Sequence, residues 1–202
     1  ILAASGSSKA GFSMFQKVER MGVVKTGPRE TVQECLDVIA KAFVQLPSTA
    51  MYLSNPEADG ICFWRTMAEE ILLSQSTDMK PLYVLTDVST QQPCAVALAY
   101  NWSPGQNYNL PKTDKMIRPE VEAEWDACGK LWNKLMLDTY DKYGEFITID
   151  FIAVVPDLAS RGLGRRLLLE VLKDADVTGV PGCCELTFMV RTPATAQVAA
   201  ER

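Results

Sequence analysis

Apolar residues recur at three- and four-residue spacing in four stretches of the chain, which predicts helices with one buried face. The first lies between Pro28 and Pro47, and the others cover about residues 56–75, 119–143 and 162–177. Pro56 and Pro119 stand at helix starts, where the first turn tolerates proline. The residues expected to face the core are Val32, Cys35, Leu36, Ile39, Ala40 and Phe43; Ile61, Trp64, Met67, Ala68, Ile71 and Leu72; Val121, Trp125, Cys128, Leu131, Trp132, Leu135 and Met136; and Leu163, Leu167, Leu168, Val171 and Leu172.

Shorter apolar runs bounded by turn residues predict strands. They cover residues 15–25, 81–88, 94–102, 145–155 and 183–190, and a short helix is expected at 194–202. The polar turn 89–93 joins the second and third runs into a hairpin, and residues 103–118 form a loop. The alternation of strands and helices predicts an α/β fold, with one central sheet flanked by helices.

Length and charge limit the classes of protein to consider. The 202 residues are 48% hydrophobic, enough for one domain, which we assign to residues 13–202. Residues 1–12 are interpreted as a disordered, processed or non-native terminus. A net charge of −5 argues against nucleic acid or an anionic membrane as partner and tolerates a cationic small molecule. No apolar run approaches the roughly 18 residues of a membrane span, so a soluble, cytoplasmic protein is expected.

The cysteine and histidine content limits the catalytic groups and metal sites that the chain can form. The six cysteines show no C-x-x-C spacing and are interpreted as reduced core thiols. The chain has no histidine, which excludes His-activated nucleophiles and His-based zinc sites. We therefore expect no metal, and a general base must be a carboxylate, a tyrosine, a lysine or water.

The run from Phe151 to Asp176 reads as a strand, a glycine-containing turn and an amphipathic helix. Gly162 and Gly164 permit close backbone approach, and the first turn of a helix offers unpaired N–H groups and a positive dipole end. This arrangement favours a bound pyrophosphate. The third glycine of a dinucleotide-binding turn is absent, because its position is occupied by Leu167, and no P-loop motif occurs.

The order Val154-x-Pro156, Arg161-Gly162-Leu163-Gly164 and a leucine-rich helix resembles the acetyl-CoA signature of the GCN5-related N-acetyltransferases (GNAT superfamily). The family's Arg/Gln position is occupied by Ala159, and neighbouring arginines can supply the missing charge. The resemblance covers about residues 15–202 and implies a GNAT-like mixed sheet in a single domain, with acetyl-CoA as cosubstrate. The implied cofactor-binding residues are Ile152, Ala153, Val154, Ala159, Ser160, Arg161, Gly162, Leu163, Gly164 and Arg165.

Strand 145–155 is where the resemblance implies catalysis. By the period-two rule Thr148, Asp150, Ile152 and Val154 share one face, and Asp150 is a charge within an apolar run. Such a carboxylate is either a general base with a raised pKa or a hydrogen-bonded buried Asp with a structural role. In vertebrate-type arylalkylamine N-acetyltransferases two histidines relay the amine proton, and their positions align with Thr148 and Asp150. The same alignment directs the N–H of Ile152 at the thioester carbonyl and that of Val154 at the pantetheine arm.

The resemblance implies direct transfer of acetyl from acetyl-CoA to a primary amine, either an arylalkylamine or a polyamine, within a ternary complex. The alternatives are acetylation of protein N-termini or lysines, and a non-catalytic acyl-CoA-binding module. Trp102 is the candidate for an amine pocket, and the acidic run from Glu120 to Asp126 either attracts a cationic substrate or is a solvated helix start. The family's thiolate-protonating tyrosine aligns with Ala200. The family's final strand pair does not follow residue 202, so the protein is expected as a monomer or, through an open sheet edge, a homodimer.

Overall fold

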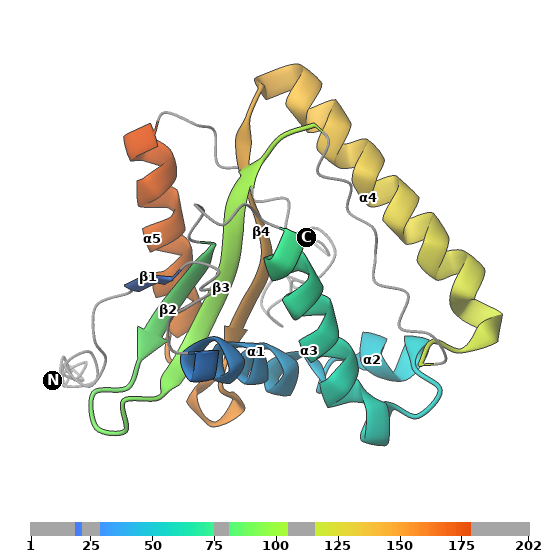
Figure 1. Ribbon diagram of the computed structural model, residues 1–202, viewed down its shortest axis with the longest axis horizontal. Helices are drawn as coiled ribbons and strands as arrows, with labels where there is room; N and C mark the ends of the chain where they lie inside the picture. Colours follow the sequence, from blue (N-terminus) through green and yellow to red (C-terminus); the bar gives the residue numbers. More distant parts are fainter. Residues whose placement is uncertain (1–18, 22–28, 75–80, 105–115, 179–202) are drawn as a thin grey trace, which may run out of the picture.

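The computed structural model describes residues 19–21, 29–74, 81–104 and 116–178, coloured by sequence in Figure 1. Four strands form one sheet in the order β1-β2-β3-β4, and each neighbouring pair is antiparallel. Their bounds are β1 (Glu19–Met21), β2 (Leu82–Thr86), β3 (Pro93–Trp102) and β4 (Phe146–Val154). The helices are α1 (Arg29–Phe43), α2 (Pro47–Tyr52), α3 (Pro56–Ser74), α4 (Glu122–Tyr143) and α5 (Leu163–Thr178), with short 3-10 turns η2 (Pro119–Val121) and η3 (Pro156–Leu158).

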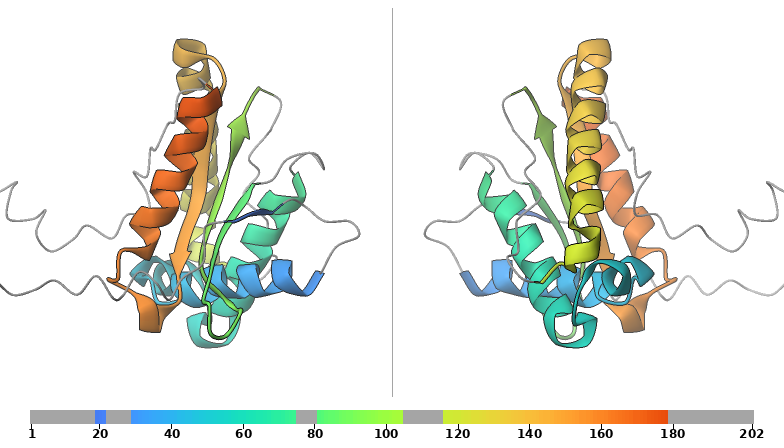
Figure 2. Two further views of the ribbon diagram at one scale, coloured as in Figure 1. Left: turned by 90° about the vertical axis from the view of Figure 1, so that its left-hand side faces the viewer. Right: turned by 90° about the vertical axis from the view of Figure 1, so that its right-hand side faces the viewer.

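Helices cover both faces of this sheet. On one face α5 packs Leu163, Leu167 and Val171 against alternate side chains of β2, β3 and β4. On the other face α1 and α3 enclose an aromatic core around Phe151, whose ring meets Phe43 edge-on at 5.0 Å. Figure 2 shows the sheet between α5 on one side and α1 and α3 on the other. The predicted α/β architecture is therefore confirmed.

The predicted helices and strands within the described residues are found, with small shifts at their ends. The prediction missed the short helix α2, which is held by Thr49: its hydroxyl donates to Phe43 O and accepts from Trp64 Nε1 at 2.8 Å. The predicted strand 183–190 and helix 194–202 lie outside the described residues, as do residues 1–12. The described strand pairs are all antiparallel, so the expected mixed sheet depends on a strand outside them.

Three residues predicted to face the core are exposed instead. On α3 the buried stripe runs through Gly60, Phe63 and Trp64, which leaves Ile61 39% exposed. On α4 only a narrow stripe is buried, and its fully buried residues are Trp125, Gly129 and Met136. Cys128 and Leu131 flank that stripe and are exposed, because α4 slants along one side of the molecule and contacts it over a narrow strip (Figure 1).

The period-two assignment for β4 is wrong because the strand contains a β-bulge. Phe151 pairs with Leu98 and Ile149 with Ala99, so Asp150 is an extra residue without a partner on β3. The bulge reverses the alternation of faces. Thr148 lies with Tyr100 on the face of α1 and α3, whereas Ile152 and Val154 pack towards α5.

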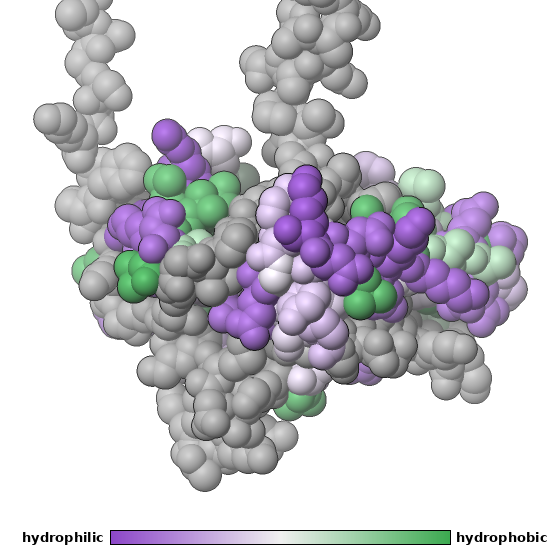
Figure 3. All heavy atoms as spheres, turned by 90° about the horizontal axis from the view of Figure 1, so that it is seen from above, coloured by the Kyte–Doolittle hydropathy of each residue, from purple (hydrophilic) through white to green (hydrophobic). Residues whose placement is uncertain are grey.

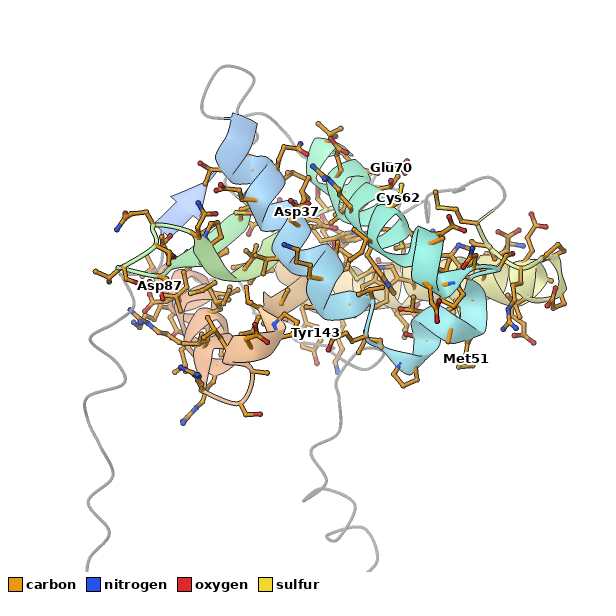
Figure 4. The ribbon with its side chains drawn as sticks, turned by 90° about the horizontal axis from the view of Figure 1, so that it is seen from below. Asp37, Met51, Cys62, Glu70, Asp87 and Tyr143 are labelled. Atoms are coloured by element: carbon orange, nitrogen blue, oxygen red, sulfur yellow. The ribbon has the colours of Figure 1, made fainter. Side chains whose placement is uncertain are left out.

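The surface of the described residues is largely polar. Seen from above, hydrophilic groups dominate and apolar groups are small and separate (Figure 3). Seen from below, Asp37 on α1 and Cys62 and Glu70 on α3 lie on two neighbouring helices, and Asp87 lies at the hairpin turn (Figure 4). Asp37 pairs with Arg65 of α3 at 3.0 Å. No helix among the described residues has the length and apolarity needed to cross a bilayer.

Candidate active site

The bulge in β4 carries a half-buried carboxylate, that of Asp150. Asp150 Oδ2 accepts a hydrogen bond from the Tyr100 hydroxyl at 2.8 Å, and the Thr148 side chain also bonds to the carboxylate. Oδ1 is closed to solvent and has no hydrogen-bond partner among the described residues. Tyr100 and Thr148 face each other across β3 and β4 and are themselves 6% and 3% exposed. These three side chains form one small polar cluster, which we call the Asp150 cluster.

Burial controls the ionisation of this carboxylate. Desolvation raises the pKa of Asp150 to about 7, and the hydrogen bonds from Tyr100 and Thr148 oppose that rise only in part. A carboxyl group with a pKa near neutrality exchanges protons readily with an amine or with water. The arrangement is therefore chemically suited to general-base catalysis.

A small pocket lies beside this cluster, between α4 and β4. Apolar and aromatic side chains form most of its wall, and the hydroxyls of Thr139 and Thr148 give it two polar points. Its lining residues are Trp132, Leu135, Met136, Thr139, Phe146, Thr148 and Ile149. It is too small for the carbon skeleton of an arylalkylamine and has room for about one water molecule.

The turn after β4 positions backbone groups at the start of α5. Gly162 has φ +78°, a left-handed conformation that a side chain strains, and Ser160 adopts φ 66°. The helix begins at Leu163, and Arg166 N donates to Gly162 O at 3.0 Å. The N–H groups of the first turn therefore lie ahead of this bond with no acceptor inside the helix. Such a turn fits the phosphates of a nucleotide cofactor.

The two glycines of this turn have different roles. A Cβ at Gly162 would meet nothing within 4 Å, so the requirement there is its positive φ. A Cβ at Gly164 would lie 3.5 Å from Ile152 Cγ2 and 3.7 Å from Val154 Cγ2, which is ordinary contact with β4. Gly162 therefore sets the shape of the turn, while Gly164 lets α5 sit close to the strand.

Charge and amide directions also suit an anionic ligand that lies along β4. Arg161 and Arg165 are exposed on the turn, and Ala159 and Ser160 are exposed beside them. Val155 N donates to Cys94 O on β3, and alternate amides of a strand point the same way. The amides of Ile152 and Val154 thus point away from β3, towards an edge that no described strand covers.

The predicted site residues fall into two groups in space. Thr148 and Asp150 meet in the Asp150 cluster, and the residues from Ala159 to Arg165 form the turn at the start of α5. Ala153 differs, because its side chain is buried in the core on the face of α1 and α3. The sequence analysis missed Tyr100. The sequence predicted that Tyr100 lies on a strand. It did not predict that Tyr100 lies opposite Thr148, because this pairing joins segments about fifty residues apart.

The exposure of the remaining candidate residues decides between the roles that the sequence left open for them. Trp102 is 3% exposed and stacks on Phe146 at 5.5 Å, so it is a core residue and does not line the small pocket. Glu120, Glu122, Glu124 and Asp126 are exposed around the start of α4, in agreement with a solvated helix start. Cys35 and Cys94 are buried as expected, whereas Cys62 and Cys128 are exposed. Over the described ranges no three His, Cys, Asp or Glu side chains gather closely enough to hold a metal ion.

Comparison with solved structures identifies the architecture. The polyamine N-acetyltransferase of Drosophila melanogaster, an enzyme that forms N-acetylagmatine, matches 92% of this chain and 81% of its own with a TM-score of 0.50 at 16% identity. This chain has a GNAT-like fold. The GNAT fold of this chain thus confirms the resemblance at the level of architecture.

Two further GNAT structures overlap less well. A mosquito arylalkylamine N-acetyltransferase like 5b matches 81% of this chain and 72% of its own at 19% identity, with a TM-score of 0.47. A Corynebacterium glutamicum protein described as histone acetyltransferase HPA2 and related acetyltransferase matches 79% and 71% at 15% identity, with a TM-score of 0.46. No protein-family model and no curated protein sequence matches the chain.

Proposed function

We propose that this protein is an acetyl-CoA-dependent N-acetyltransferase that acts on a primary amine of a small molecule by direct attack within a ternary complex. The observation that carries the proposal is Asp150, a half-buried residue whose Oδ1 is closed to solvent and whose pKa is raised to about 7, on the strand that leads into the α5 turn. The GNAT fold and the glycine turn support the same chemistry.

Acetyl-CoA would bind along β4 and the start of α5. The first-turn amides of α5 and the exposed Arg161 and Arg165 would hold its phosphates, and the amides of Ile152 and Val154 would face its acyl-bearing arm. Acetyl-CoA would supply the thioester: the substrate ammonium would first lose one proton, and attack by the neutral amine nitrogen would then form a C–N bond and break the C–S bond. The second nitrogen proton would leave as the amide forms and would balance protonation of the thiolate, so that the products are an amide, a thiol and the one proton lost by the ammonium.

Asp150 would take the proton from the substrate ammonium. Because Oδ1 is closed to solvent, the proton would travel through the Thr148 hydroxyl and a water molecule in the small pocket beside it. The carboxylate accepts it because its pKa near 7 matches neutral conditions. No tyrosine is needed for the departing thiolate in this scheme, since water can protonate it.

The proposed substrate class comes from the resemblance to the GNAT superfamily. Polyamine acetylation is the activity of the Drosophila protein, and an arylalkylamine is the alternative. The net charge of −5 suits a cationic amine of either class.

A thiol-release screen tests the proposal. Purified protein is incubated with acetyl-CoA and, separately, with arylalkylamines, polyamines and peptides that carry a free N-terminus or lysine. Amine-dependent release of thiol with a small amine, and little with peptides, is the expected result. Release with peptides alone would move the activity to protein acetylation. Binding of acetyl-CoA without release for any amine would leave an acyl-CoA-binding module.

A further inference from the structure

We infer that Tyr100 is a positioning residue that holds the Asp150 carboxylate in the orientation and ionisation state needed for proton transfer. The inference rests on the proposed function. It concerns a residue on β3, the neighbouring strand, which no motif of the sequence marks.

The register of the sheet brings Tyr100 to this position. Tyr100 pairs directly with Thr148, and the bulge at the next residues turns the unpaired Asp150 side chain towards the same face. The Tyr100 hydroxyl then donates to Asp150 Oδ2 at 2.8 Å, across a sequence separation of 50 residues. Both partners of this bond sit on the sheet, so the geometry is fixed by backbone pairing rather than by a loop.

The bond leaves the two carboxylate oxygens in different environments. Oδ2 accepts the hydrogen bond from Tyr100, whereas Oδ1 is closed to solvent and has no partner among the described residues. A tyrosine stabilises the carboxylate only moderately, because it is a neutral donor, whereas an arginine or lysine would hold the group ionised and weakly basic. The hydrogen bond from Tyr100 thus opposes part of the rise in pKa that burial causes, and it leaves Asp150 able to accept a proton at neutral pH.

No charged side chain of the described residues contributes to the shift of Asp150. Burial, Tyr100 on β3 and Thr148 on β4 are its causes. Among the elements packed on this face, α1 carries Cys35 in the same core, with a pKa raised to about 12 by burial, so that thiol is neutral. Tyr140 of α4 packs against the same core through Trp102. The pKa of Asp150 therefore reflects burial first, and the hydrogen bonds from Tyr100 and Thr148 second.

The chain offers a matched control on the opposite face of the sheet. Tyr83 of β2 donates to Asp174 Oδ2 of α5 at 2.8 Å, and both this tyrosine and Tyr100 are buried. Tyr83→Phe removes the same kind of bond at a distance from β4, because β3 lies between the two strands. A general loss of stability should therefore appear in both variants.

The experiment compares Tyr100→Phe, Tyr83→Phe and the unmodified protein. Carboxyl carbon NMR, assigned with Asp150→Asn, follows the titration of Asp150 and needs no acetyl transfer. In Tyr100→Phe the midpoint should rise by about one to two pH units, the usual effect of a lost hydrogen bond to a carboxylate. With an amine identified by the thiol-release screen, kcat/KM at about pH 7 should fall about 5- to 50-fold and recover to within about 2-fold near pH 9. Tyr83→Phe should leave both the midpoint and the pH profile unchanged.

The NMR and kinetic arms separate two kinds of failure. An unchanged Asp150 midpoint in folded Tyr100→Phe overturns the inference, as does an equal loss of activity at both pH values. If no amine supports thiol release, the proposed function fails while the NMR arm still decides what Tyr100 does to Asp150. Should Tyr100→Phe not fold, 3-fluorotyrosine at position 100 keeps the size and strengthens the donor. A lowered midpoint then supports the inference, and an unchanged one overturns it.

Discussion

At the scale of single residues, the conflict between Asp150 and its surroundings is the main finding. The sequence predicted that a carboxylate in the apolar run of β4 must be paired or shifted in pKa, and the pKa is indeed raised to about 7. The sequence did not predict the bulge, because one extra residue in a strand leaves no mark in the apolar pattern. For that reason it grouped Thr148 with Ile152 and Val154, which lie on the opposite face.

Replacing Asp150 by Asn should stabilise the fold and slow the reaction together. An unfolded Asp loses its proton near its ordinary pKa of about 4, while folded Asp150 keeps its proton until about pH 7. The free energy of unfolding of the unmodified protein therefore falls as pH rises from about 4 to about 7, by on the order of 4 kcal/mol at most. Asp150→Asn should remove that fall and be the more stable protein near pH 8. Denaturant unfolding at several pH values measures this difference.

The same variant should lose at least about tenfold in kcat/KM for the amine, because general-base assistance is worth roughly 100- to 10,000-fold. Its affinity for acetyl-CoA should change little, since Asp150 lies apart from the α5 turn. A variant that is more stable yet less active marks a functional residue. If Asp150→Asn unfolds readily instead, the carboxylate has a structural role.

At the scale of elements, the outcome of prediction depended on element length and on one-sided burial. Helices α1, α3 and α5 and the hairpin of β2 and β3 were found from periodicity, because each buries a face through several turns or pairs. The six-residue helix α2 was missed, since so short an element shows no period. Too many residues of α4 were predicted to be buried, because the sequence does not reveal how narrow a strip of that helix contacts the other elements.

The two glycines at the start of α5 should respond differently to alanine. Gly162→Ala forces a side chain into φ +78°, costs about 1 kcal/mol and distorts the turn. Gly164→Ala only adds an ordinary contact with Ile152 and Val154. Acetyl-CoA should raise the Tm of the unmodified protein and of Gly164→Ala, and the rise should shrink or vanish in Gly162→Ala. Thermal unfolding at several concentrations of acetyl-CoA checks this, and equal shifts in both variants would contradict the assignment of the turn.

The helix α2 should depend on the Thr49 hydroxyl. Thr49→Val keeps the shape but leaves buried Trp64 Nε1 without its acceptor, which costs about 1 to 3 kcal/mol. Ser54→Ala, at an exposed position just beyond the same helix, is the control and should change stability by less than about 0.5 kcal/mol. Urea unfolding compares the two, and equal effects would mean that this bond does not stabilise α2.

At the scale of the whole molecule, one sheet connects the parts of the proposed site. Strand β4 carries the Asp150 cluster on the face of α1 and α3 and directs Ile152 and Val154 at α5 on the other face. The resemblance carried by the glycine signature predicted this architecture, and the comparison with a solved structure agrees at the level of the fold. Tyr100 and the bulge could not be predicted in the same way, since both depend on the register between distant strands.

The arrangement of thiols in the molecule leads to the last prediction, which concerns the order of the reaction. A covalent acetyl-cysteine route needs a thiolate, but burial raises the pKa of Cys35 to about 12 and that of Cys94 to about 11, so both remain protonated at neutral pH. If transfer is direct, as proposed, initial rates measured against both substrates should give intersecting lines, and acetyl-CoA alone should leave the protein mass unchanged. Cys35→Ser and Cys94→Ser, provided that they fold, should retain turnover within a few-fold. Parallel lines together with an acetylated cysteine in the intact mass would replace direct transfer with a two-step route.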